Sequence, residues 1–171
     1  MYEKLTKPIL YNDQYSFLYP SQYWDRRDCS LSTPFPIPGG VVKKRDLYFH
    51  NKTNATLWVV YADYEPNCEG SVKWKKHGWY KVNPGKMVKV TMNVLYMDIG
   101  VGHPYPFMDH QFLYYAEDHI GHKWGGECFT QIPDNPFDWC WNTGSTNSRT
   151  LGLKKKIITP SEESYTQGLI L

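Results

Sequence analysis

The stretch from His77 to Val94 constrains the fold of this chain more than any other part of it. Between residues 88 and 94, apolar and polar side chains alternate one by one, and a period of two is typical of a β-strand with one buried face. The segment Asn83-Pro84-Gly85 precedes this strand. Pro84 already has the φ that the second position of a tight turn requires, and Gly85 can adopt the positive φ of the third. We therefore predict a β-hairpin over Trp79–Val94, at the centre of the fold.

Short runs of strand-forming residues recur along the rest of the chain, separated by turn-forming residues. They cover Leu47–His50, Leu57–Tyr64, Val72–Lys76, Phe112–Ala116, His122–Trp124, Leu151–Ile158 and Gly168–Leu171. The second of these runs is apolar on both faces, as expected of a central strand between two layers. No stretch carries an apolar stripe at helical spacing for more than about three turns. The pattern predicts an all-β protein, a single-domain antiparallel β-sandwich over residues 47–171.

The chain before the first predicted strand has another character, and we assign residues 1–46 to an irregular N-terminal arm. Prolines recur through residues 1–40, and each disfavours a helix at the residue before it. The arm also carries large aromatic side chains that can anchor it by packing: Tyr11, Tyr15, Phe17, Tyr19, Tyr23 and Trp24. The sequence allows the arm to pack either on its own domain or on a neighbouring subunit. Because the β domain should close its own core, we expect the arm to contact a second subunit and to support a homo-oligomer.

Length and composition narrow the class of protein. A chain of 171 residues is long enough for one domain with a sizeable core. Its formal net charge of +2 is too small to indicate a nucleic-acid partner. The longest apolar runs are too short to span a bilayer, so no transmembrane segment is expected. The N-terminus lacks the apolar segment of a signal peptide, which favours a cytoplasmic protein or one released by a non-classical route, unless a leader is missing.

The four cysteines are Cys29, Cys68, Cys128 and Cys140. No two of them form a C-x-x-C pair, so the spacing argues against a zinc knuckle. Four cysteines allow three disulfide pairings, and the sequence does not choose among them. Buried free thiols in a reducing compartment are an equally open alternative.

Several short motifs, taken in order, resemble a bacterial family known only as domain of unknown function 1036. The resemblance covers residues 47–130 and rests on Asn51-x-Thr53, Val59-Val60, Gly78-Trp79-Tyr80, Pro84-Gly85, Tyr114-Tyr115-Ala116-Glu117, Trp124-Gly125 and Cys128. It implies a compact β domain and no catalytic residues. The family usually has a cysteine where this chain has His50, so a family-type disulfide to Cys128 does not carry over.

A second resemblance is to the aegerolysins, small β-sandwiches that bind membrane lipids. It rests on His50-Asn51 at a strand end and on the cysteine-containing aromatic segment Trp139-Cys140-Trp141. This resemblance implies a lipid partner.

Candidate chemistry is sparse in the sequence. Histidines and carboxylates gather at His103, Asp109, His110, Glu117, Asp118, His119 and His122. His119 and His122 are the best metal-ligand candidates, but they flank a predicted turn where solvated polar residues are expected anyway, so no metal is predicted. Glu117 and Asp118 are adjacent and diverge on a strand, which disfavours paired-carboxylate hydrolysis. A thiol nucleophile at Cys128 or Cys140 has no identifiable partner, and no phosphate-loop or nucleophile-elbow motif is present. We expect no enzyme and no cofactor.

Aromatic side chains offer the other candidate surface. Trp79 and Trp124 are predicted to lie in the core, where they anchor their hairpins. Trp139 and Trp141 fall in a predicted loop, 132–144, and are the best candidates for an exposed contact or ligand-binding pair. The first expectation for function is a non-enzymatic protein that acts through protein–protein contacts, as a self-assembling structural subunit. The alternative is a lipid- or glycan-binding module, toxin-like in kind, that uses loop aromatics.

Overall fold

The computed structural model describes residue 29 and residues 40–98, 104–106, 110–158 and 164–171. The chain divides into two compact units, Met1–Ser30 and Leu31–Leu171. The strands all belong to the second unit, and it is described here by itself. The predicted arm contacts, from Tyr11 to Trp24, lie outside the described residues.

Every regular element among the described residues is a β-strand. In chain order they are β1 (Gly40–Asn51), β2 (Leu57–Tyr64), β3 (Trp74–Val82), β4 (Met87–Asp98), β5 (Pro104–Pro106), β6 (His110–Asp118), β7 (Lys123–Trp124), β8 (Cys128–Pro133), β9 (Phe137–Cys140), β10 (Ser148–Ile158) and β11 (Ser164–Leu169). The all-β class predicted from the alternating pattern is confirmed. The described part of the chain contains no helix long and apolar enough to cross a membrane.

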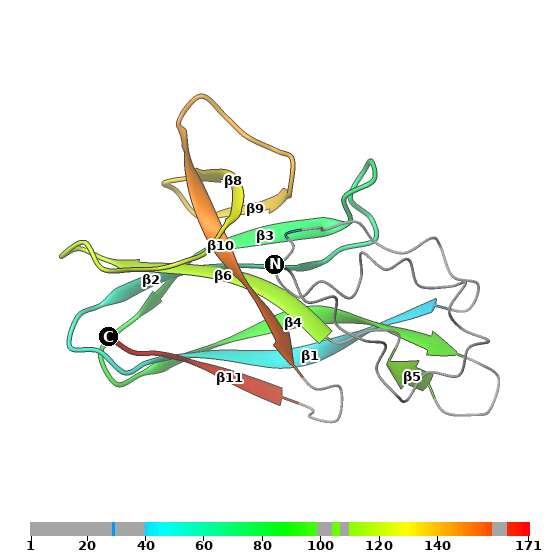
Figure 1. Cartoon of the computed structure of the whole chain (residues 1–171), viewed down its shortest axis with the longest axis horizontal. Coiled ribbons are helices and arrows are strands. Elements are labelled where there is room, and N and C mark those ends of the chain that lie inside the picture. Colours follow the sequence, from blue (N-terminus) through cyan, green and yellow to red (C-terminus); the bar gives the residue numbers. More distant parts are fainter. Residues whose placement is uncertain (1–28, 30–39, 99–103, 107–109, 159–163) are drawn as a thin grey trace, which may run out of the picture. The chain divides into compact units, whose positions relative to one another are not determined.

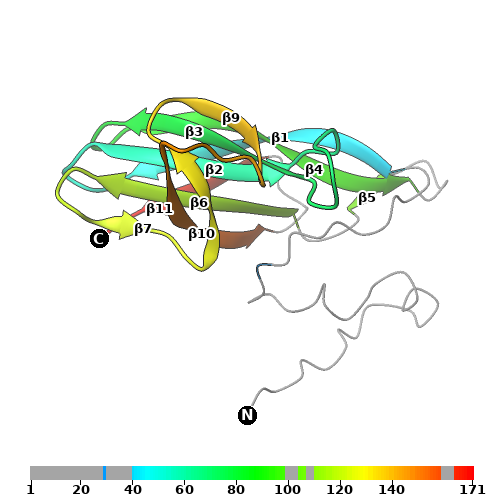
Figure 2. The same ribbon diagram turned by 90° about the horizontal axis from the view of Figure 1, so that it is seen from above.

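The strands form two sheets that lie one above the other (Figures 1 and 2). The smaller sheet has the order β11-β1-β4-β5, and the larger has the order β8-β10-β6-β2-β3-β9 with β7 beside β6. In Figure 1 β8, β9 and the start of β10 rise above β2 and β6 of the same sheet, on the side away from the smaller sheet. This arrangement leaves the outer face of the larger sheet partly covered.

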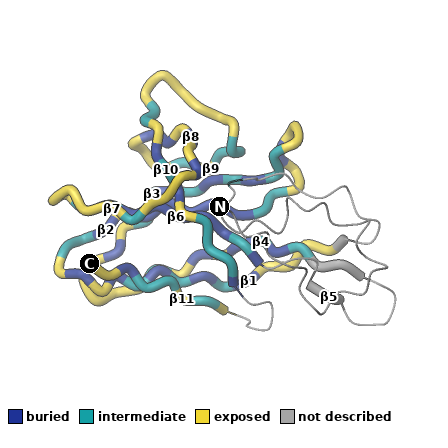
Figure 3. Tube along the Cα trace, viewed as in Figure 1, coloured by how far each residue is buried: buried dark blue, intermediate teal, exposed yellow. Residues whose placement is uncertain are grey.

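The core lies between the two sheets, where the buried stretches of their strands face one another (Figure 3). Fully buried side chains come from both layers, among them Phe49 of β1, Met92 of β4, Val59 of β2 and Phe112 of β6. The ring of Phe49 meets that of Phe112 edge to face, with centroids 6.1 Å apart. Burying each such side chain stabilises the fold by roughly 1.5–3 kcal/mol, so the inter-sheet contact is the main source of stability.

The turn predicted at Pro84-Gly85 is present, but the predicted hairpin is wrong. Gly85 has φ +70°, and the Lys86 N–H donates to the Asn83 carbonyl at 3.0 Å. The two flanking strands nevertheless belong to different sheets, because β3 pairs with β2 and β9 while β4 pairs with β1 and β5. Asn51 at the end of β1 bonds with Gly85 and Lys86, so β4 starts its ladder on β1. An alternating pattern identifies a strand and its buried face, but it does not identify the partner strand.

Three further features differ from the sequence prediction. The ladder is not wholly antiparallel, since β11 pairs with β1 in parallel, with Asp46 opposite Ser164 and Asn51 opposite Leu169. The boundary predicted at residue 47 falls inside β1, which begins at Gly40. The predicted loop over 132–144 contains β9, which pairs with β3. Charged residues near Arg45 and the prolines around β9 masked the strand pattern in both places.

The structure resolves the open question of the cysteines. Cys68 in the β2–β3 loop is joined to Cys140 at the end of β9, with their Cα atoms 5.7 Å apart. All four cysteines lie within the described residues, and none of them is free. The Cys68–Cys140 bridge spans 72 positions of the sequence and ties the short edge strand β9 to the loop beside it.

Candidate functional site

Three cross-strand neighbours lie side by side on the outer face of the larger sheet. In the ladders, Trp58 of β2 stands between Lys81 of β3 and Glu117 of β6. Leu57 and Val59, on either side of Trp58, are fully buried in the core. Because successive side chains alternate between faces, Trp58 points away from the core. It keeps 40% of its surface exposed, so part of its indole is open to a ligand.

A second indole, that of Trp79 on β3, lies next to this row and is half-buried. Its Nε1–H donates to the Pro133 carbonyl at 2.8 Å, and its ring meets the Tyr115 ring edge to face at 6.2 Å. The Arg149 guanidinium lies 5.3 Å from the ring centroid. The prediction that Trp79 and Trp124 lie in the core is therefore wrong, because both are partly buried; Trp124 packs against the core cluster without belonging to it.

Arg149 of β10 is held by carboxylates on two sides. It donates to both oxygens of Glu117, with Nη1 at 3.0 Å from Oε2, and its Nε lies 3.2 Å from Oδ1 of Asp134. The Tyr115 hydroxyl donates to Glu117 Oε2 at 2.7 Å. Partial burial acts to raise the pKa of Glu117, but the hydrogen bonds from Arg149 and Tyr115 outweigh it and hold the pKa below its ordinary value. Glu117 is therefore an ionised hydrogen-bond acceptor at neutral pH.

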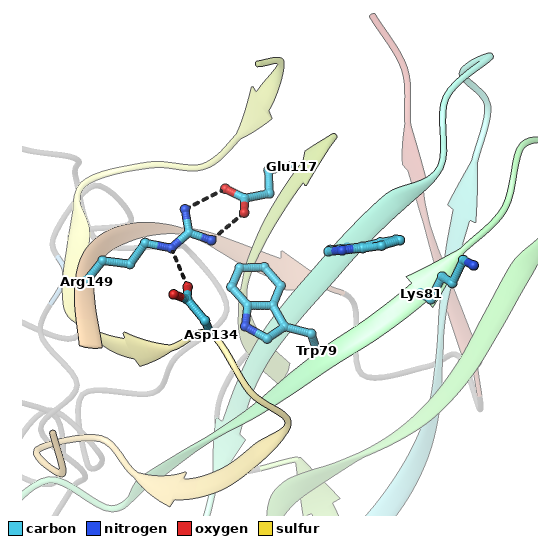
Figure 4. A pocket seen from close by; sticks show the side chains of 6 residues that line it. Trp79, Lys81, Glu117, Asp134 and Arg149 are labelled. Atoms are coloured by element: carbon cyan, nitrogen blue, oxygen red, sulfur yellow. Dashed lines mark hydrogen bonds and ion pairs between the residues drawn. The ribbon is translucent and has the colours of Figure 1, made fainter. Parts of the chain in front are cut away.

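These residues surround an open pocket of about 420 Å³, seen close by in Figure 4. Its walls are Trp58, Trp79, Lys81, Glu117, Asp134 and Arg149. Two of these side chains are cations and two are carboxylates, so the formal charges cancel. The volume lies within the range of small-ligand sites, which combine apolar walls with a few polar groups that fix orientation. We call this group of six residues the Trp58 pocket.

The predicted aromatic pair does not form an exposed site. Trp139 belongs to β9, where it stands opposite Lys76 of β3, and both Trp139 and Trp141 are half-buried. The backbone N–H of Trp141 donates to the backbone carbonyl of Trp74 at 2.9 Å. The expectation of two loop tryptophans free for contact is therefore wrong, because β-pairing and the Cys68–Cys140 bridge bring this segment onto the sheet edge.

A buried lysine, which the sequence analysis did not single out, holds the same segment. Lys76 is fully buried, and the three N–H groups of its Nζ are shared among four acceptors, Thr130 Oγ1 at 2.9 Å and the carbonyls of Gln131, Trp141 and Thr143 at 2.6, 2.8 and 2.6 Å. The same Nζ lies 5.8 Å from the centroid of the Trp139 ring. Burial lowers the pKa of Lys76 to about 8. The ammonium is enclosed by neutral acceptors, so this is a structural centre rather than a ligand site.

The histidine candidates do not come together at one site, and only His122 takes part in the turn formed by Asp118. His122 Nδ1 lies 2.7 Å from Asp118 Oδ2, while Asp118 Oδ1 accepts backbone N–H groups from residues 120, 121 and 122. His119 joins no such cluster, and His110 lies buried beside Arg45. Across the described ranges, no group of three or more His, Cys, Asp or Glu side chains is placed to hold a metal ion. His103 and Asp109 lie outside those ranges.

The fold and the pocket define this molecule as an all-β protein with an open, aromatic-walled pocket on the outer face of one of its two sheets. No known family model matches the chain, and no curated protein matches it closely enough to count as a relative. The resemblances to domain family 1036 and to the aegerolysins therefore remain predictions. The assignment of function rests on the chemistry of the Trp58 pocket.

Proposed function

We propose that this protein is a carbohydrate-binding β-sandwich and that the Trp58 pocket is its binding site. The single observation that carries the proposal is the exposed indole of Trp58, fixed on a central strand and bordered by ionised hydrogen-bonding groups. The alternative function expected from the sequence is a lipid- or glycan-binding module, with Trp139 and Trp141 as the binding residues. The Trp58 pocket takes their place.

The pocket supplies the two kinds of contact that a sugar ring needs. A pyranose has a face rich in C–H groups, which packs on an aromatic ring, and hydroxyls at its rim, which donate and accept hydrogen bonds. The exposed Trp58 indole offers the ring surface. The carboxylates of Glu117 and Asp134 offer acceptors, and Lys81 and Arg149 offer donors. Asp134 is the most adaptable of these groups, because its side chain is 76% exposed.

The charge of the pocket favours a neutral sugar. Arg149 is already paired with Glu117 and lies close to Asp134, so its charge is compensated within the protein. Lys81 lies with its Nζ 5.6 Å from the Trp58 ring centroid, which makes it a local cation on the same wall. An acidic sugar gains from Lys81 but approaches Asp134 and Glu117, whereas a neutral hexose meets balanced charges. We therefore assign neutral hexopyranoses as the ligand class.

A glycan array tests the proposal, with titration calorimetry on every hit. We expect binding to neutral glycans and a loss of at least tenfold in affinity for Trp58→Ala, about 1.4 kcal/mol. Phe129→Ala is the matched control, because Phe129 is an exposed aromatic side chain of β8, 65% exposed, outside the pocket. Retained affinity in Trp58→Ala, or binding to lipid vesicles and to no glycan, contradicts the proposal and returns the function to the lipid-binding alternative.

Self-assembly as a structural subunit, the first expectation from the sequence, depends on the aromatic arm and stays a prediction. Its test is the mass of the full chain in solution compared with that of a variant that lacks residues 1–38. A folded, monomeric truncated variant of an oligomeric parent supports the arm as the assembly element. A truncated variant that unfolds places the arm in the core of its own domain.

A further inference from the structure

In the part of the chain that the structure describes, the two sheets end in four edge strands. These strands differ in how far each is protected from pairing with another chain. These edges are β11 and β5 in the smaller sheet and β8 and β9 in the larger one. An edge strand carries a row of backbone groups that can pair with a further strand. Proteins block such pairing with prolines, charges, short strands or covering segments.

Three of the four edges carry such protection. Strand β5 is the tripeptide Pro104-Tyr105-Pro106, and neither proline has an N–H to donate. Strand β9 has four residues and carries Asp138, which is paired with Lys75 at 3.0 Å and with His77 at 2.6 Å. Strand β8 ends in Pro133, and its Thr130 hydroxyl and Gln131 carbonyl are engaged by the Lys76 ammonium.

Strand β11 lacks the first two of these features, proline and charge. Its six residues, Ser164-Tyr165-Thr166-Gln167-Gly168-Leu169, include no proline and no charged side chain. It pairs with β1 on one side, and no described strand lies on its other side. At this edge the Gln167 amide donates to the Gly168 carbonyl at 2.9 Å, while Gln167 Oε1 is buried without a hydrogen-bond partner.

The backbone geometry shows which groups of β11 face the open side. The Lys52 N–H donates to the Leu169 carbonyl at 3.0 Å, so the Leu169 carbonyl points towards β1. Backbone groups alternate along a strand, and Tyr165 and Gln167 therefore face β1 as well. The N–H and C=O groups of Ser164, Thr166 and Gly168 point to the open side.

We propose that β11 is a self-pairing edge, at which a second copy of this chain adds its own β11 in antiparallel orientation. The two-fold axis passes through Thr166, so that Thr166 faces Thr166 of the second copy and Ser164 faces Gly168. Each of these is a hydrogen-bonded pair that exchanges N–H and C=O groups, with the Gly168 carbonyl using its second lone pair beside the Gln167 amide. The two smaller sheets then become one continuous sheet. The interface is isologous and closes as a dimer. Thr166 is exposed on the outer face, where a facing Thr–Thr pair adds a favourable cross-strand contact.

Equilibrium sedimentation of the wild type, Thr166→Pro and Thr166→Val over a range of concentrations tests this proposal. Proline at position 166 removes one outward N–H and leaves the ladder to β1 intact, because edge strands accept proline where the N–H faces outward. We expect a wild-type dimer, a dimer for Thr166→Val, and at least tenfold weaker association for Thr166→Pro with unchanged circular dichroism. A wild type that stays monomeric, or a Thr166→Pro variant that dimerises like the wild type, overturns the proposal.

Amide hydrogen exchange separates a second copy from a covering segment of the same chain. If β11 pairs with a second copy, exchange at the Thr166 and Gly168 amides slows as the protein concentration rises. Slow exchange that does not change with concentration means that the edge is covered within one chain, which also overturns the proposal. Both experiments are independent of glycan binding, because none of the residues of β11 lines the Trp58 pocket.

Discussion

Two regions of the larger sheet each place a cation beside a tryptophan ring, but only one of them leaves space for a ligand. In the Trp58 pocket the Arg149 guanidinium lies 5.3 Å from the Trp79 ring centroid, and at the β3–β9 edge the Lys76 ammonium lies 5.8 Å from that of Trp139. Lys76 is fully buried and surrounded by neutral acceptors, whereas Arg149 is partly exposed and paired with carboxylates. A cation beside an indole is therefore not a site in itself. It becomes a candidate site where polar groups and an aromatic face remain open to a ligand.

The largest effect that this comparison predicts is on stability, at the buried lysine. Lys76→Met removes the ammonium that Thr130 and the carbonyls of Gln131, Trp141 and Thr143 share, and among the described residues only the Trp141 carbonyl keeps another side-chain donor, the Thr130 hydroxyl at 2.9 Å. We expect the free energy of unfolding to fall by about 3 kcal/mol or more. Denaturant titration measures the fall. Lys75→Met is the matched control, because Lys75 is a partly exposed ion-pair partner of Asp138 and its loss should cost less than about 1 kcal/mol. Equal losses in the two variants contradict the assigned role of Lys76.

The pH dependence of stability tests the same residue in another way. The pKa of Lys76 is lowered from 10.5 to about 8 in the folded protein, so the unfolded chain binds more protons between these values. Stability therefore rises with pH across this window, since proton loss relieves the cost of burying the charge. Relative to Lys76→Met, we expect the wild type to gain on the order of 2 kcal/mol between pH 8 and 10.5. A difference that stays flat or falls over this range contradicts the account.

The ion pair of the Trp58 pocket should affect stability less. Glu117→Gln weakens the contact with Arg149, and because Arg149 is partly exposed we expect a loss of about 1 kcal/mol. The folded-state pKa of Glu117 lies below its ordinary value of 4.5, so its contribution is present above that value and is lost as the pH falls below it. Acid titration of unfolding in the wild type and in Glu117→Gln measures this. The two curves should converge at low pH, and a constant separation would falsify the assignment.

The smallest predicted effect on stability is that of Trp58→Ala. The Trp58 side chain is on the outer face and lies outside the core, so we expect the free energy of unfolding to change by less than about 1 kcal/mol. Thermal unfolding followed by near-ultraviolet circular dichroism is the check. A large loss would mean that Trp58 is held by the fold as Lys76 is, and that the difference between the two regions is not real.

The single strands and turns of the fold could be predicted from the sequence. The pairing of strands that are distant in the sequence could not. Leu57–Tyr64 matches β2 residue for residue, and Gly85 has the positive φ that its turn predicts, because both depend on neighbours along the chain. The partner of β4 was missed, since alternation carries no information about pairing. Parallel pairing of β11 with β1 joins segments more than a hundred positions apart and leaves no local pattern.

The candidate site was missed for related reasons. Trp58 sits in a run that is apolar on both faces, so nothing local marks its indole as exposed. Glu117 and Arg149 are 32 positions apart and meet only because β10 crosses beside β6. Trp139 and Trp141 follow prolines and precede polar residues, which gave them a loop signature that β-pairing and the disulfide to Cys68 override. The one sequence signal that points to the pocket is that Trp58 lies between two core residues on a central strand, so its side chain faces away from the core.

The central claim is that the exposed indole of Trp58, and not the half-buried ring of Trp139, contacts a sugar. Its most direct test is the indole N–H region of a proton–nitrogen correlation spectrum, recorded while a neutral glycan selected on the array is titrated into the protein. We predict that the Trp58 and Trp79 signals, assigned by single substitutions, shift progressively and saturate, while the Trp139 signal stays in place. Saturating shifts of Trp139 and Trp141 with Trp58 unmoved would contradict the account.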